Sequence, residues 1–573
     1  MPPNILPVYI IYSNVTGKPA TEADFIHRLK DFSSSALLRI CSVLNMVLTQ
    51  LADGYDEESH TRLVHTFFPP TLANALLATH RPVFHRHQLL FVAQEALRHC
   101  EVTLPSPVSL PEAKESGILM LMASELLASL PVKRNSASEE LARRISSILP
   151  DMETNGPSSY NRKMARSLAM CTRFADQLHG TKNHFDIRKL FREATQLDLD
   201  IFYALVFGCF SRFLNLKEIK SSSNLADYAV GPHYFRKCAA IASEDLNSFF
   251  AYMSSDAANF TAEVRAKNPH RNEFTILRNR PLFDDGGIYR PLDLSMLADK
   301  MESGVFWSVN AQVDAKIRDQ FHVFWGEVFE LYVSWLIGSS VDGEINKFFP
   351  NPHYLKKGLE VCDGIVLSGT SVILIECKGS TLTAKGKYGG DASVLDAELQ
   401  KKFVGTTATR KGVRQLVDAI QKLFGREAHD QVSGIDLGKI ENVIPVLLTR
   451  DDIGSAFNLS AYLNFHFQEL IRGNSFTPTV SPLCAVSVDD FERLAPYLVD
   501  VSLSEILLAR LNGDKDLIFP LWLGDNAVLN NVEPRPSPLL TAEIEKLGEI
   551  CRVRLGLPDD ESLTARALDT PSS

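Results

Sequence analysis

The chain has 573 residues, of which 45% are hydrophobic and 22% charged, and its formal net charge is −10. This composition is typical of a globular protein and excludes a mainly disordered or collagen-like chain, and the length predicts roughly three to four domains. The nine cysteines contain no Cys-x-x-Cys pair and predict reduced, buried thiols. We find neither a signal peptide nor an apolar stretch long enough to cross a bilayer. These features predict a cytoplasmic protein without membrane contacts.

Residues 1–270 are predicted to form a mainly helical domain with a role in recognition or regulation. Apolar residues recur at helical spacing in 25–51, 89–104, 119–130, 141–149 and 197–216. Residues 271–319 are predicted to be a connecting segment with short strands. The helical block has no concentrated basic stripe, so we expect it to bind a partner protein or a second copy of the chain.

Residues 320–530 are predicted to form an α/β domain with a mixed central sheet flanked by helices. Apolar patterning places a helix at 321–337, strands at 359–367 and 372–377, helices at 393–404 and 411–424, and a strand at 443–448. The turn 368–371 predicts that the first two strands form a hairpin. Residues 531–573 are predicted to be a Pro-rich tail with one helix, at 542–555.

Three charged residues of this hairpin point to metal-dependent chemistry. Glu376 and Lys378 share one face of their strand, because side chains alternate along a strand, and the hairpin places Asp363 beside Glu376. Two neighbouring carboxylates repel each other unless a cation compensates them, and Mg²⁺ or Mn²⁺ prefers such oxygen ligands. The ion polarises a phosphodiester and lowers the pKa of water, while the lysine orients that water.

The stretch Asp363…Glu376-Cys377-Lys378 resembles the PD-(D/E)XK nuclease superfamily, which has a restriction-endonuclease-like fold. The resemblance implies that Asp363, Glu376 and the backbone carbonyl of Cys377 bind the metal, and that Lys378 positions the attacking water. Glu-x-Lys occurs three times in the chain, but only this copy follows an apolar strand with an upstream aspartate. Cys362 stands where the family usually has proline, a substitution that the superfamily tolerates.

Two further residues are implied by the same resemblance. The family often has an acidic residue on the helix before the first strand, and Gly326-Glu327-Val328-Phe329-Glu330 favours Glu330, with Glu327 as the alternative. The helix is apolar nearly all round, so a buried Glu330 needs compensation, which a metal site offers; otherwise it emerges at an exposed edge. Gln415 lies where some branches place a glutamine on the helix after the Glu-x-Lys strand.

Basic residues gather after the Glu-x-Lys strand. Residues 376–422 contain nine basic and five acidic side chains, a local net charge of +4. Such a patch suits a polyanionic backbone, although an ordinary solvated face has the same composition. We expect residues 379–390 to form a flexible loop that closes on nucleic acid. The predicted nucleic-acid contacts are Lys385, Lys387, Lys401, Lys402, Lys411 and Arg414.

The sequence therefore predicts an endonuclease that uses Mg²⁺ or Mn²⁺ to hydrolyse phosphodiester bonds, with DNA favoured over RNA. A nuclease core joined to an unfamiliar accessory domain resembles bacterial restriction or anti-phage defence effectors in architecture. Two alternatives stay open: an RNA nuclease, and a catalytically inactive module of the same fold that binds nucleic acid or acts as a scaffold.

Overall fold

The structure is a computed structural model. It describes residues 9–50, 57–102, 110–128, 137–155, 160–214, 229–235, 241–341, 343–355, 358–406, 410–426, 430–451, 458–513, 529, 532 and 537–557. In this part of the chain, no helix combines the length and the apolar character needed to cross a membrane.

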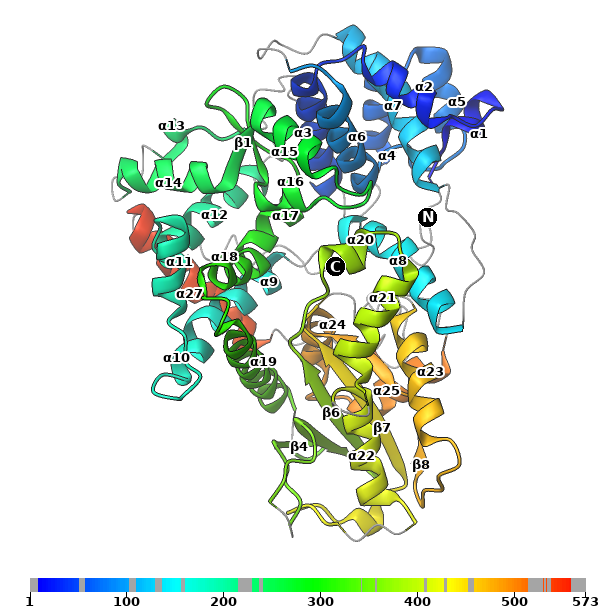
Figure 1. Ribbon diagram of the computed structural model, residues 1–573, viewed down its shortest axis with the longest axis vertical. Helices are drawn as coiled ribbons and strands as arrows, with labels where there is room; N and C mark the ends of the chain where they lie inside the picture. Colours follow the sequence, from blue (N-terminus) through cyan, green and yellow to red (C-terminus); the bar gives the residue numbers. More distant parts are fainter. Residues whose placement is uncertain are drawn as a thin grey trace.

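The first helices form a layer of their own at the end of the molecule farthest from the large sheet (Figure 1). Their apolar side chains form one core with those of α15 and α16. The helices of this layer are α1 (Tyr12–Thr16), α2 (Glu22–Leu29), α3 (Ser34–Gln50), α4 (Glu57–Phe67), α5 (Pro70–Leu77), α6 (Arg86–His99) and α7 (Leu110–Ala128).

A second helical group follows and includes a small three-stranded sheet of order β1-β2-β3. Its elements are α9 (Tyr160–Leu168), the π-helix η1 (Ala169–Phe174), α10 (Ala175–Gln177), α11 (Ile187–Thr195), α12 (Leu199–Leu214), α13 (Pro232–Phe235), α14 (Ser243–Met253), β1 (Ser254–Asp256), α15 (Ala257–Lys267), α16 (Thr275–Asn279), β2 (Leu282–Asp284), β3 (Tyr289–Pro291), α17 (Leu294–Asp299), the π-helix η4 (Lys300–Gly304) and α18 (Val305–Gln312).

A six-stranded mixed sheet forms the centre of the α/β part, in the order β4-β5-β6-β7-β8, with β9 also paired to β7. β4, β5 and β6 are antiparallel, and β7 is parallel to β6, β8 and β9. The sheet confirms the predicted α/β class. Its strands are β4 (Asn346–Pro350), β5 (Gly364–Ser368), β6 (Ser371–Lys378), β7 (Asn442–Thr449), β8 (Thr479–Val480) and β9 (Cys484–Ser487).

Helices cover both faces of this sheet, which explains why β6 and β7 are almost continuously apolar. One face carries Ile373 and Ile375 and shares a core with α19 and the second helical group. The other carries Val372 and Leu374 and packs against α8 and α21–α23. The remaining helices of the chain are α8 (Ala137–Asn155), α19 (Arg318–Ser340), α20 (Ala384–Tyr388), α21 (Ala392–Leu399), η5 (Gln400–Val404), α22 (Val413–Phe424), η6 (Leu437–Lys439), α23 (Leu459–Ile471), α24 (Val488–Leu494), η8 (Ala495–Tyr497), α25 (Leu503–Asn512) and α27 (Pro538–Leu555).

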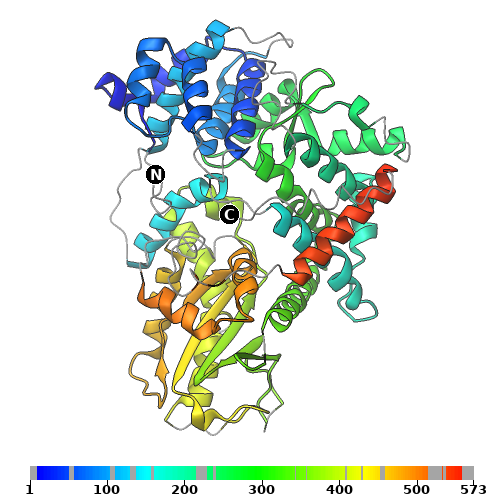
Figure 2. The ribbon, with the colours of Figure 1, turned by 180° about the vertical axis from the view of Figure 1, so that it is seen from behind.

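Two elements lie far from their neighbours in sequence. Helix α8 leaves the N-terminal layer and lies beside α21 and α23, with Ile145 and Leu149 in the core of the sheet domain. Helix α27, near the C-terminus, lies along α12 and α9, as Figure 2 shows from behind. The division expected at residue 270 therefore does not separate two independently packed bodies. About half of the predicted C-terminal tail, 531–573, lies outside the described residues, and the helix predicted at 542–555 forms part of α27.

Candidate active site

Helix α19 brings an acidic residue to the end of strand β6. A Cβ atom placed on Gly379 would lie 3.5 Å from the Cα atom of Gly326 and 3.5 Å from the Cβ atom of Phe329. The two glycines let the helix approach the strand end closely. One turn beyond Gly326, Glu330 lines a small cavity with Asp363 and Cys377.

The hairpin of β5 and β6 places Asp363 and Glu376 at the same end of the sheet. It turns at Gly369, which has a positive φ of 63°, and its last paired residues are Gly364 and Ile375. Extending this register by one residue sets Asp363 opposite Glu376. The ladder ends here because the backbone N–H of Cys377 donates to Oδ2 of Asp363, at 2.5 Å. The register places Asp363 and Glu376 at the same end of the sheet, and the closeness of their carboxyl groups stays a prediction.

The Glu376 carboxylate is almost completely buried. Its residue is 1% exposed, and its Oε1 accepts a hydrogen bond from Nζ of Lys378 at 2.5 Å. Its other oxygen, Oε2, has no hydrogen-bond partner among the described residues. Burial raises the pKa of Glu376 to about 8; Lys378 opposes this rise, and the negative charge of Asp363 adds to it. Half of this carboxylate therefore lacks the compensation that burial requires.

The neighbouring acids have the same shortage of positive charge. Burial, followed by the charge of Asp363, raises the pKa of Glu330 to about 8. The pKa of Asp363 is also raised by burial, against the effects of Lys378 and the Cys377 amide. Burial and Asp363 raise the pKa of Glu360, an acid that the sequence did not single out as a site residue. We call these four acids and Lys378 the carboxylate cluster.

Lys378 is the cation at the centre of this cluster. Burial disfavours its charged form, but Glu376 and Asp363 outweigh that effect, and the net result is a raised pKa. Its ammonium group therefore stays charged. It lies next to Glu376 and balances negative charge that a metal ion would otherwise balance.

The cluster has the donors for a hard divalent ion, but they do not converge in this arrangement. Among the described residues, no group of three or more His, Cys, Asp or Glu side chains is placed to hold one ion. The cavity lined by Glu330, Asp363 and Cys377 measures about 10 Å³, which is room for one water molecule at most. The buried, unpartnered Oε2 of Glu376 nevertheless fits a cation ligand, so the chemistry of the residues fits Mg²⁺ or Mn²⁺.

The two alternatives for the helix acid are separated by position. Glu330 faces the cluster, whereas Oε1 of Glu327 accepts a hydrogen bond from Nδ2 of Asn183, at 3.0 Å, in the loop before α11. Gln415 lies in the first turn of α22 and is half-buried. No described hydrogen bond joins its side chain to Asp363, Glu376 or Lys378, so its predicted role stays a prediction.

The predicted basic contacts divide into exposed and occupied side chains. Lys385, Lys401 and Lys411 are exposed, which suits phosphate contacts. Nζ of Lys402 donates to the carbonyl of Thr381 at 2.5 Å, and Nε of Arg414 donates to the carbonyl of Gly405 at 3.2 Å.

Lys387 does not fit the prediction of a phosphate contact. Its ammonium lies 2.9 Å from Oε1 of Glu153 and 2.7 Å from Oδ1 of Asp451, and its side chain is only 12% exposed. The expected flexible loop also contains an ordered helix, α20, in which Tyr388 is buried. The sequence signal for this was weak, because both acids that bind Lys387 are distant in the chain.

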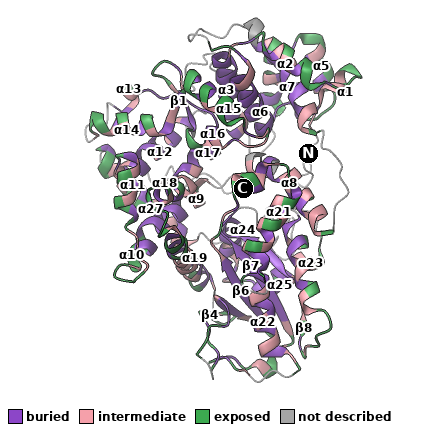
Figure 3. Ribbon diagram, viewed as in Figure 1, coloured by how far each residue is buried: buried purple, intermediate pink, exposed green. Residues whose placement is uncertain are grey.

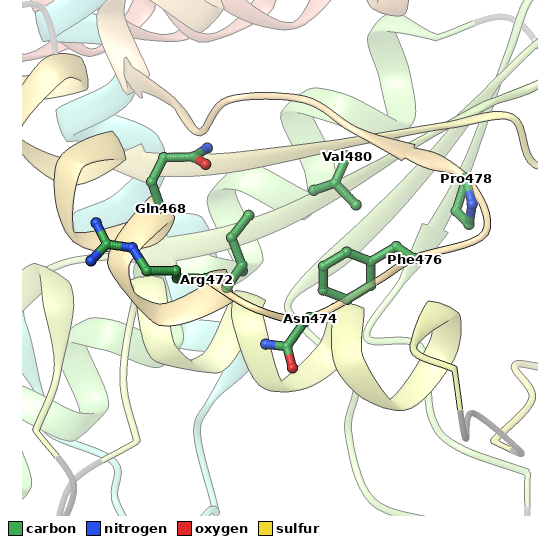
Figure 4. A pocket seen from close by; sticks show the side chains of 7 residues that line it. Gln468, Arg472, Asn474, Phe476, Pro478 and Val480 are labelled. Atoms are coloured by element: carbon green, nitrogen blue, oxygen red, sulfur yellow. The ribbon is translucent and has the colours of Figure 1, made fainter.

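A larger hollow of the structure lies away from the carboxylate cluster (Figure 4). It borders β8, which pairs with the first residues of β7, whereas the cluster lies at the other end of that strand. No acidic or nucleophilic side chain is among its lining residues, which are Gln468, Ile471, Arg472, Asn474, Phe476, Pro478 and Val480. The chemistry of the molecule therefore points to the cluster and not to this hollow.

Comparisons with known proteins leave the chain without an assigned relative. No protein-family model matches it, and neither the curated proteins nor the solved structures contain a match.

Proposed function

We propose that this protein is a metal-dependent nuclease whose active site is the carboxylate cluster on a restriction-endonuclease-like core. The observation that carries the proposal is the meeting of Asp363, Glu376, Lys378 and Glu330 at one sheet end, where a buried acid and two half-buried acids outnumber the single cation. Burying several like charges lowers the stability of the folded protein, and groups with strongly shifted pKa values concentrate at catalytic and binding sites.

The residues of the cluster have separate roles in this proposal. Asp363, Glu376 and the Cys377 carbonyl would hold Mg²⁺ or Mn²⁺, with Glu330 as the acid contributed by α19. The bound ion would supply Lewis-acid activation of a phosphodiester. Lys378 then leaves its contact with Glu376, orients a water molecule through Nζ and stabilises negative charge that develops beside it.

A nucleic acid backbone is the substrate class that best suits the surroundings. Lys385, Lys401 and Lys411 are exposed after the Glu-x-Lys strand and offer phosphate contacts in a chain of net charge −10. DNA remains favoured over RNA, and a role in restriction or anti-phage defence remains a prediction from the architecture.

The test is cleavage of plasmid, linear duplex, single-stranded DNA and RNA by the full chain in Mg²⁺, Mn²⁺ or EDTA. We expect cleavage with either metal and none in EDTA. Thermal unfolding gives a second readout: saturating metal at 100 times Kd stabilises a protein by about 2.7 kcal/mol, and Asp363→Asn should remove this gain. Cleavage in EDTA, or equal cleavage by Asp363→Asn and the parent chain, would contradict the proposal.

One observation favours a second function, a nuclease-like module that binds nucleic acid without cutting it. Lys378 closes an ion pair with Glu376, and no three described acids converge on one point. In that case the full chain binds DNA with strong salt dependence, but neither metal produces cleavage. The same substrate panel, with binding measured by fluorescence anisotropy, separates the two functions.

A further inference from the structure

Two exposed leucines flank a short turn in the chain between β4 and β5. Leu355 and Leu359 are 57% and 59% exposed, the two largest fractions among the large apolar residues of the described chain. Single exposed apolar side chains are common at protein surfaces, but two that flank one turn form an apolar tip, which packing within the chain does not explain. Figure 3 shows this chain, next to β4, mainly in the colour of exposed residues.

Backbone hydrogen bonds hold the two leucines at the surface. Residues 352–355 and 358–361 pair as a small antiparallel hairpin, which we call the rim hairpin. The N–H of Tyr354 donates to the carbonyl of Leu359 at 2.8 Å, and that of Leu355 donates at 2.9 Å to a carbonyl of the loop before β7. Tyr354 is 2% exposed and packs in the core of the sheet domain. Because side chains alternate along an extended segment, a buried Tyr354 directs its neighbour Leu355 outward.

The rim hairpin borders the side on which the carboxylate cluster meets solvent. Glu360, at the end of the hairpin, is the exposed acid of the cluster, whereas Glu330 and Asp363 are half-buried. A hydrogen bond with the side chain of Asp363 contributes to the raised pKa of Glu360. The N–H of Asn351, just before the hairpin, donates to the carbonyl of Asp363 at 3.1 Å. A ligand that reaches the cluster past Glu360 therefore lies beside the hairpin.

The length of the chain limits how far the leucines lie from the cluster. Leu359 precedes Asp363 by four residues. An extended chain spans at most about 3.6 Å per residue, so the two Cα atoms lie within about 14 Å of each other. A DNA duplex rises about 3.4 Å per base pair, so this distance corresponds to about four base pairs.

The charge of the segment favours a polyanion as its partner. From residue 347 to residue 359 the sequence has three lysines and no acidic residue, in a chain of net charge −10. Lys347 is exposed, and Nζ of Lys422 lies 5.2 Å from the centre of the Tyr354 ring, beside the hairpin. Cations that contact phosphates, together with apolar side chains that contact bases, are the combination by which proteins insert side chains between base steps.

We propose that the rim hairpin docks the substrate, and that Leu355 and Leu359 insert against the bases of duplex DNA within about four base pairs of the scissile phosphate. The inference rests on the proposed function. The two leucines are positioning residues: they unstack neighbouring bases and hold the bent backbone at the carboxylates, but they do not touch the reacting atoms. Because pyrimidine–purine steps unstack most easily, cleavage near such steps is favoured.

The test uses the full chain with Leu355→Ala and Leu359→Ala together, since shortening exposed side chains has little effect on stability. A linear duplex that carries 2-aminopurine reports unstacking in EDTA, where the substrate stays intact. We expect the parent chain to raise the fluorescence about twofold or more, and the double variant to lose this rise and to bind the duplex about tenfold more weakly. In Mg²⁺, the KM for the duplex should rise by a similar factor, with a smaller change in kcat.

Two further variants show whether apolar character at the tip is what matters. Leu355→Met with Leu359→Met keeps the apolar volume and should retain the fluorescence rise and the KM of the parent chain. The matched control is Val553→Ala on α27, because that side chain is 54% exposed but its helix packs on α12 and α9. It should also behave as the parent chain does.

Several outcomes would overturn the docking role. The first is parent-like fluorescence and KM in the double alanine variant of an enzyme that cleaves. The second is cleavage confined to single strands. The third is a dimer of the parent chain that the double alanine variant converts to a monomer in light scattering, because the leucines would then bind a second copy of the chain.

The docking role and the proposed function fail separately. If the parent chain cleaves nothing in either metal but unstacks the duplex through the two leucines, the nuclease proposal fails and the hairpin still contacts nucleic acid. If the parent chain cleaves and the leucines have no effect, only the docking role fails. If it neither cleaves nor binds the duplex, both fail.

Discussion

Two buried glutamates in this protein have opposite electrostatic outcomes. The side chains of Glu153 and Glu376 are 8% and 1% exposed, so both lose most of their hydration on folding. The pKa of Glu153 falls to about 2, whereas that of Glu376 rises to about 8. Burial raises both values. The difference lies in the neighbours: Glu153 has Lys387, Arg278 and Tyr388, whereas Glu376 shares Lys378 with other acids.

The contrast separates buried charge that is satisfied within the fold from buried charge that is left without enough positive partners. The pair of Arg86 and Asp293 belongs with Glu153: it is bidentate, at 2.5 and 2.8 Å, and the Asp293 side chain is 0% exposed. There burial is again outweighed by the cation, and the pKa of Asp293 falls. The carboxylate cluster instead keeps an unpartnered oxygen and excess negative charge, which a bound cation would remove.

The largest expected effect is that of Lys378→Ala on cleavage. Loss of the group that orients the attacking water should lower the rate by roughly a thousandfold, while metal and DNA binding persist. Single-turnover cleavage and anisotropy measure the two quantities separately. The control is Lys439→Ala, because that side chain is 82% exposed and pairs with Asp436 within its own turn. Wild-type turnover in Lys378→Ala would contradict the assigned role.

Breaking a satisfied pair should have a large effect on stability. Arg86→Met leaves the fully buried Asp293 without its cation and should cost about 3–5 kcal/mol in the free energy of unfolding. Chemical denaturation measures this loss. A loss of stability within the error of the measurement would mean that the buried Arg86–Asp293 pair does not stabilise the fold. This result would contradict the comparison with the carboxylate cluster.

The pH dependence of stability tests whether the pKa of Glu153 is lowered in the folded protein. Its folded-state pKa of about 2 lies below the ordinary value of 4.5, so its contribution is present above pH 4.5 and disappears as the pH falls through 2. Thermal unfolding between pH 6 and 2.5 should show the parent chain losing about 2 kcal/mol more than Glu153→Gln. Glu140→Gln should depart from the parent chain by less, because the ion pairs that lower the pKa of Glu140 are partly exposed to solvent. Parallel curves for all three proteins would contradict the assignment.

The smallest expected effect is a gain of stability at the carboxylate cluster. Glu330→Gln removes one of the competing negative charges and should stabilise the metal-free protein by about 1 kcal/mol at pH 8.5. Cleavage should fall in the same variant, since the acid is a metal ligand in the proposed mechanism. Differential scanning fluorimetry and the cleavage assay measure the two changes. A destabilisation as large as that of Arg86→Met would mean that the Glu330 carboxylate stabilises the fold, as the carboxylate of Asp293 does.

The local chemistry of the candidate site was predictable from its own short stretch of sequence. A hairpin turn, an apolar strand and the alternation of side chains predicted that Asp363, Glu376 and Lys378 meet; the structure places them at one sheet end and pairs Lys378 with Glu376. The Gly-x-x-Phe pattern likewise pointed to Glu330. Glu360 was not singled out as a site residue: it fell inside the predicted strand 359–367, whereas β5 begins only at Gly364 and Glu360 precedes it.

The occupation of Lys387 was not predictable in this way. Its partners Glu153 and Asp451 are 234 and 64 residues away, and only their meeting in the folded chain turns an apparently free cation into a buried one. The composition of residues 376–422 gives their net charge, but it does not show which basic side chains form ion pairs with acids from distant parts of the chain.

The sequence by itself determined the mixed α/β class and the helical character of the first part of the chain, and it pointed to Asp363, Glu376, Lys378 and Glu330 as the candidate site. These features depend on periodicity and on contacts between neighbours along the chain. Only the tertiary structure decided that α8 packs on the sheet domain, that α27 returns to α12, and that Lys387, after β6, pairs with Glu153 of α8. Those outcomes depend on the burial of apolar faces and charges against parts of the chain that are distant in sequence. A sequence pattern predicts which surface must be buried, but it does not predict which element packs against that surface.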